Sequence, residues 1–122
     1  MSKCCNQIIY SPANTACCPS PETIVTENCQ DLDNIADTPV TTIWSSPNSY
    51  MSFTFFVNPE ETSPASIIVT NNNTVLPAIS VQPGTSVTRT FRGVTLITVA
   101  AADAGETTGG RFCYKLYKQV TL

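Results

Sequence analysis

From Glu22 onward the sequence is a series of short segments rich in Thr, Val, Ile, Phe and Tyr, separated by clusters of Pro, Gly, Asn and Asp. β-Branched and aromatic residues favour strands, and no segment repeats its apolar residues with the 3.6-residue period of a helix. Eight strand-like segments can be counted between the turn signals. They cover residues 23–29, 39–45, 50–57, 65–71, 74–81, 85–92, 94–101 and 111–120. We therefore expect an all-β fold, with eight strands arranged as a jelly-roll sandwich.

Alternation along the segments predicts which side chains are buried, because successive residues of a strand point to opposite faces. In residues 50–57, Phe53 and Phe55 share the apolar face. In the last segment, Phe112 and Tyr114 share the apolar face, so Cys113 is predicted to point out of the core. The face that carries Cys113 also carries Lys115, Tyr117 and Gln119.

Residues 1–21 are predicted to form an N-terminal connector arm, followed by the folded domain, residues 22–122. Pro12, Pro19 and Pro21 break any helix and cannot all belong to a central strand. A fully extended segment of this length reaches about 70 Å, whereas the radius of gyration of a domain of this size is about 13 Å. The arm could therefore reach a neighbouring molecule.

The composition argues against several classes of function. The chain has no histidine, which removes the commonest general base and metal ligand. Its net charge is −3 and its six basic residues are scattered, so we expect no nucleic-acid partner. No segment approaches the roughly 20 apolar residues of a membrane span. We expect no catalytic residues, no cofactor and no membrane association.

Six cysteines are the most distinctive residues of the chain. They are Cys4, Cys5, Cys17, Cys18, Cys29 and Cys113. Zinc sites use cysteines two to four residues apart, usually with histidine, so the two vicinal doublets are not expected to bind metal. Vicinal cysteines seldom bond each other, so each doublet should bond two separate partners.

Two disulfide arrangements remain open from the residues alone. In one, three bridges lie within the chain, and Cys29 could then bond Cys113 if the first and last strands are neighbours. In the other, cysteines of the arm bond cysteines of other copies. A domain of this size does not need internal bridges to fold, which favours the second arrangement.

The cysteine pattern, together with the strand count and the absence of histidine, resembles the endospore appendage (Ena) pilin family of Bacillus-type spore formers. The resemblance covers essentially the whole chain. It rests on the Cys17–Cys18 doublet, on Cys29 after ten intervening residues, and on Cys113 within Gly-Gly-Arg-Phe-Cys-Tyr of the last segment.

The resemblance implies a structural subunit that self-assembles by side-by-side pairing of β-sheets into a fibre. It implies that Cys17 and Cys18 bond Cys29 and Cys113 of other subunits. Cys4 and Cys5 form a second doublet that could add further disulfides, and helical and stacked-ring assemblies both occur in the family. Other copies of the chain are the expected partner, with related pilin subunits or an anchor in the spore coat or exosporium as further candidates.

The resemblance also accounts for a conflict in the sequence. Six cysteines suggest an oxidising location, yet the N-terminus has no apolar signal segment. Spore-surface proteins are made in the cytosol of the mother cell and exposed when it lyses. The alternative function is a monomeric extracellular binding or adhesion module with internal disulfides.

Overall fold

The computed structural model describes residues 21–121, which form seven strands and no helix. The strands are β1 (Pro21–Ala36), β2 (Thr41–Val57), β3 (Ala65–Asn71), β4 (Thr74–Val75), β5 (Ile79–Val81), β6 (Ser86–Ala101) and β7 (Thr107–Thr121). The described part thus holds no helix long and apolar enough to cross a bilayer. The chain divides into two compact units, Thr26–Tyr117 and Met1–Val25 with Lys118–Leu122. The core and the cysteine pair discussed below belong to the unit Thr26–Tyr117.

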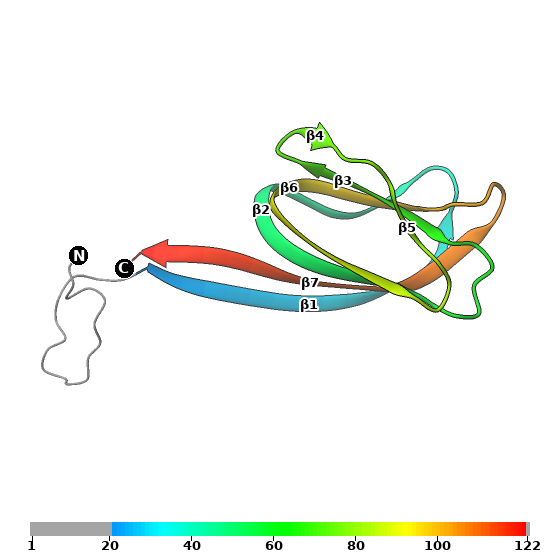
Figure 1. The fold of residues 1–122 in the computed structure, drawn as a ribbon, viewed down its shortest axis with the longest axis horizontal. Coiled ribbons are helices and arrows are strands. Elements are labelled where there is room, and N and C mark those ends of the chain that lie inside the picture. Colours follow the sequence, from blue (N-terminus) through cyan, green and yellow to red (C-terminus); the bar gives the residue numbers. More distant parts are fainter. Residues whose placement is uncertain (1–20, 122) are drawn as a thin grey trace, which may run out of the picture. The chain divides into compact units, whose positions relative to one another are not determined.

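The strands form one antiparallel sheet in the order β1-β7-β2-β6-β3-β4, with β5 also paired to β3. The long strands β2 and β6 curve through this sheet (Figure 1). Residues 50–57 of β2 pair with β7, whereas residues 94–101 of β6 pair with β3. The register between β2 and β6 shifts three times between Thr42 and Met51, where the chain bends. One half of the sheet therefore contains β1 and β7, and the other contains β3, β4 and β5.

The all-β class is as predicted, but the structure has seven strands where eight were expected. The single strand β2 covers residues 41–45 and 50–57 of two expected segments, and β6 covers residues 86–92 and 94–101 of two others. The signal Ser46-Pro47-Asn48 produces a bend and not a reversal of the chain, because Ser46 binds across the bend. Its hydroxyl donates to the Val94 carbonyl at 3.1 Å and contacts the Ser49 hydroxyl at 2.8 Å.

The segment 74–81 splits into β4 and β5, with Pro77 between them. Proline cannot donate a ladder hydrogen bond, so strands beside it are confined to edges. Within the described residues β4 and β5 each pair only with β3, which agrees with this expectation. The β3–β4 turn consists of Asn72 and Asn73, both with positive φ (53° and 62°), as a two-residue hairpin loop of type I′ requires.

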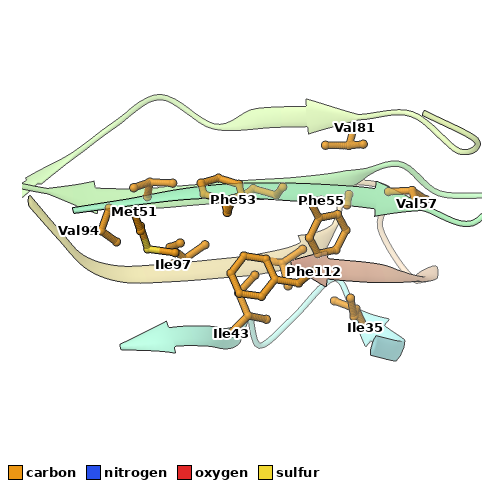
Figure 2. Packing of buried hydrophobic residues seen from close by; sticks show 14 residues of the cluster. Ile35, Ile43, Met51, Phe53, Phe55, Val57, Val81, Val94, Ile97 and Phe112 are labelled. Carbon is orange, nitrogen blue, oxygen red and sulfur yellow. The ribbon is translucent and has the colours of Figure 1, made fainter. Parts of the chain in front are cut away.

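The core lies between the two halves of the sheet. Its buried residues are Ile35, Ile43, Met51, Phe53, Phe55, Val57, Ala65, Ile67, Val69, Val81, Val94, Ile97, Val99 and Phe112. Figure 2 shows these side chains packed against one another between the strands. The alternation predicted for residues 50–57 is confirmed, since Phe53 and Phe55 are 1% and 0% exposed. Burial of each such side chain stabilises the fold by about 1.5–3 kcal/mol.

Phe53 and Phe112 connect β2 with β7 through the core. Their ring centroids lie 5.8 Å apart with the rings tilted by 50°, a geometry that adds about 0.5–1.5 kcal/mol to the burial. Gly110 makes the approach of these two strands possible, because a Cβ there would overlap the carbonyl oxygen of Phe56. The packing fixes which residues of β7 face outward, and Cys113 is one of them.

Candidate crosslinking site

Cys29 on β1 and Cys113 on β7 form a disulfide within the chain. The two strands are neighbours in the sheet, and the Cα atoms of the two cysteines lie 4.0 Å apart although 84 residues separate them in sequence. The sequence allowed this internal bridge as one of two alternatives, on the condition that the first and last strands are neighbours. In the structure β1 and β7 are neighbours.

The disulfide lies on the outer face of the sheet. Phe112 is 0% exposed and belongs to the core, so Cys113 next to it points to the opposite face. Cys29 is exposed and Cys113 half-buried. The prediction that Cys113 points out of the core is confirmed.

A row of paired residues continues from the disulfide across the outer face. Cys113 pairs with Thr54 of β2, and Thr54 pairs with Thr88 of β6. The Thr54 and Thr88 hydroxyls contact each other at 2.8 Å. We call Cys29, Cys113, Thr54 and Thr88 the disulfide row. It places the Thr54 side chain next to Cys113 and the Thr88 side chain next to Thr54.

An open pocket of about 220 Å³ lies over this row. All four members of the row line it. The other lining residues are Glu27, Asn28, Ser52, Tyr114, Lys115 and Tyr117. Because the side chains of the row are small, the outer face is hollow where it meets the disulfide. A segment of chain placed in this pocket would lie against the disulfide.

The charges around the disulfide are of both signs and exposed. Glu27 and Lys115 lie two residues from Cys29 and Cys113 respectively, on the same faces of their strands. Arg111 Nε and Asp31 Oδ1 lie 3.4 Å apart and connect β7 with β1, but both side chains are more than half exposed, so the pair contributes about 0–1 kcal/mol.

Asp37, in the loop after β1, has a lowered pKa. The backbone N–H of Gly105 donates to Asp37 Oδ2 at 3.0 Å and lowers the pKa of Asp37 below its ordinary value. Asp37 does not line the pocket, so this shift concerns the contact between two loops and not the cysteines. Among residues 21–121, no three His, Cys, Asp or Glu side chains are placed to hold one metal ion.

The structure brings together two of the predicted site residues, Cys29 and Cys113. Cys4, Cys5, Cys17 and Cys18 lie in residues 1–20 of the predicted connector arm, outside the described residues. Sequence reasoning missed Thr54 and Thr88. Their place in the disulfide row depends on the register of β7, β2 and β6, and no local pattern in the sequence specifies that register.

The fold and the site define a class of protein: a single-sheet antiparallel β-domain with an exposed disulfide between neighbouring strands. The family model for endospore appendages matches residues 15–120 of the chain. The chain therefore belongs to the endospore appendage family.

A solved structure has a similar fold and comes from work describing Bacillus endospore appendages as a novel family of disulfide-linked pili. The TM-score is 0.69 and the sequence identity is 22%, over 88% of this chain and 98% of that one. No curated protein is significantly similar to the chain.

Proposed function

We propose that the protein is a structural subunit that self-assembles by β-sheet augmentation into a disulfide-crosslinked fibre on the spore surface. One observation supports the proposal that arm cysteines of another copy bond Cys29 and Cys113. The Cα atoms of Cys29 and Cys113 lie 4.0 Å apart on an open face, and consecutive Cα atoms of a chain lie about 3.8 Å apart. The spacing of the two acceptors thus matches that of a vicinal cysteine doublet.

The doublet in this proposal is Cys17–Cys18 of another copy, which bonds Cys29 and Cys113 once the bond between those two has opened. Residues 1–21 act as the connector, and residues 22–122 as the domain that is joined. Cys4 and Cys5 offer a second doublet for additional bonds. The solved structure with a similar fold belongs to a family of disulfide-linked pili, which supports this assignment.

The domain in this proposal is a jelly roll. If β2 and β6 are divided at their bends, the pairing gives two four-stranded groups. The first contains β1, β7, residues 50–57 of β2 and residues 86–91 of β6. The second contains residues 41–45 of β2, residues 94–101 of β6, β3, and β5 with β4. Two such groups around one core are the arrangement of a jelly roll.

Augmentation would use the open edges of these groups. Within the described residues, residues 41–45 of β2 pair only with β6, and β4 pairs only with β3. Monomeric proteins protect such edges with charge. Here Val40, next to the β2 edge, is 51% exposed, and Val75 of β4 is 66% exposed. Pairing between copies would satisfy the backbone groups of the edge and cover these side chains.

The protein has no catalytic role in this account. It is made in the mother-cell cytosol, reaches the spore surface on lysis, and binds chiefly copies of itself. Related pilin subunits or an anchor in the spore coat or exosporium would complete the appendage.

The intrachain Cys29–Cys113 bond favours a second candidate, a monomeric binding module with internal disulfides. Non-reducing gel electrophoresis with negative-stain microscopy of the purified full chain separates the two. The fibre subunit gives filaments and a ladder of bands that reductant collapses. A single band under both conditions, with no filaments, would refute the fibre and leave the binding module.

A further inference from the structure

We propose that the Cys29–Cys113 disulfide is the reactive group of assembly, and that a connector thiolate from another copy opens it by attacking the sulfur of Cys113 from the pocket. The inference rests on the proposed function and adds to it the chemical step and its direction. Its basis is the juxtaposition of an exposed disulfide with a pocket that both of its cysteines line and that extends over Thr54 of β2 to Thr88 of β6.

The direction follows from the disulfide row. Thiol–disulfide exchange needs the attacking thiolate in line with the sulfur–sulfur bond, so access decides which sulfur is attacked. In the disulfide row, Cys113 lies between Cys29 and Thr54, and Thr88 follows Thr54 on the next strand. These small side chains line the pocket, which leaves room for an attacking sulfur beside Cys113.

The surroundings of the pocket suit a thiolate. The hydroxyls of Thr54 and Thr88 share one hydrogen bond at 2.8 Å, so one hydroxyl proton remains to be donated to an incoming sulfur. Lys115 lines the same pocket, and its positive charge attracts a thiolate. Cys29, the leaving sulfur, is exposed and can be solvated as it departs.

The occupant is the Cys17–Cys18 segment of a second copy. It is a short stretch of Ser, Asn, Thr, Ala and Pro around the doublet, with no charged residue between Ile8 and Pro21. Its small uncharged side chains can enter a pocket that is itself lined by small hydroxyl side chains. The sequence places it on an arm long enough to leave its own domain.

The step balances without an oxidant. The connector thiolate bonds the sulfur of Cys113, the Cys29–Cys113 bond breaks, and Cys29 leaves as a thiolate that takes up the proton lost by the connector thiol. One disulfide is consumed and one is formed. The second bond, between the other connector cysteine and Cys29, releases two electrons and two protons, and it therefore needs a two-electron oxidant such as dioxygen.

The test uses the full chain with Cys4, Cys5, Cys17 and Cys18 replaced by Ser. It is mixed, without oxygen, with an equal amount of a synthetic peptide of residues 12–23 that carries Cys18→Ser. Samples are quenched with iodoacetamide and mapped by mass spectrometry without reduction. The inference predicts the peptide bonded to Cys113 and the alkyl group on Cys29. Three results would each overturn it: peptide mainly on Cys29, no peptide adduct, or Cys29 and Cys113 already present as thiols in the isolated protein.

A pocket-filling variant tests the route. Thr54→Phe should slow formation of the adduct at least tenfold, whereas Thr107→Phe, at an exposed position of β7 that does not line the pocket, should leave the rate unchanged. If Thr54→Phe does not fold, Thr88→Phe at the far end of the row replaces it. Equal rates for the pocket variant and the Thr107→Phe control would overturn the route through the pocket.

Failure of this inference can be told from failure of the fibre proposal. Wild-type chain is isolated with Cys29–Cys113 either bonded or reduced, and both forms are assembled. If only the reduced form, on air oxidation, gives fibres with connector links, the fibre proposal stands and the exchange is wrong. If neither form gives fibres or connector links, both are wrong. Connector links formed by the bonded form without oxygen support both.

Discussion

At the scale of single residues, the account depends on the two faces of β7. Phe112 enters the core and Cys113 lies outside it, so one strand both stabilises the domain and presents a cysteine on the outer face. The same division occurs in β2, where Phe53 is buried and Thr54 lines the pocket. Changes on the inner face should therefore alter stability, and changes on the outer face should alter crosslinking.

The inner face gives a prediction with a matched control. Phe53→Ala should lower the free energy of unfolding by about 3–5 kcal/mol, because it leaves a cavity at a fully buried site. Phe56→Ala makes the same chemical change at a half-buried position on the outer face and should cost less than about 2 kcal/mol. Urea unfolding followed by circular dichroism measures both, and equal losses would show that the faces are assigned wrongly.

At the scale of the elements, the open strand edges at residues 41–45 of β2 and at β4 lack the charged side chains that usually protect such edges. Charged residues make up only 12% of the chain, and the large exposed apolar side chains include Val40 and Val75 beside open edges. An edge that carries valine and no charge can pair with another copy.

A charge at these edges should block assembly and spare the fold. The double variant Val40→Lys with Val75→Lys should unfold within about 0.5 kcal/mol of wild type, because both positions are exposed. It should form far fewer filaments, counted by negative-stain microscopy. Ala104→Lys, which adds a charge in the exposed β6–β7 turn, is the control and should assemble normally. Undiminished filaments in the double variant would exclude these edges from the contact.

The elements also show how far the sequence can be interpreted alone. Alternation in residues 50–57 predicted the buried face of β2, and alternation in 111–120 predicted the outward direction of Cys113, because both depend only on local geometry. The structure divides the chain differently from the eight expected segments, because Ser46-Pro47-Asn48 bends β2 without reversing it, β6 also continues without a break, and segment 74–81 splits into β4 and β5. The pocket could not be predicted, since Thr54 meets Cys113 only through pairing between strands far apart in sequence.

At the scale of the whole molecule, the proposed function predicts that the connector strengthens a fibre whose subunits are joined by sheet pairing. Cys17→Ser with Cys18→Ser should leave the domain folded, because the described residues form a core of their own between Ile35 and Phe112. Its filaments should come apart at lower temperature and lower denaturant concentration than wild type, as followed by light scattering. Cys4→Ser with Cys5→Ser is the comparison that shows which doublet makes the crosslink. If the Cys17→Ser, Cys18→Ser chain cannot fold at all, the cysteines serve folding and not crosslinking.

The central claim is that connector sulfurs bond cysteines of a different molecule, and isotope mixing measures this directly. Equal amounts of ¹⁵N-labelled and unlabelled subunits are assembled, alkylated and digested without reduction, and peptides joined through the Cys17–Cys18 segment to Cys29 or Cys113 are weighed. The account predicts heavy–light pairs as abundant as the two like pairs together. Linked peptides that are only heavy–heavy and light–light would place every bond within one chain and contradict it.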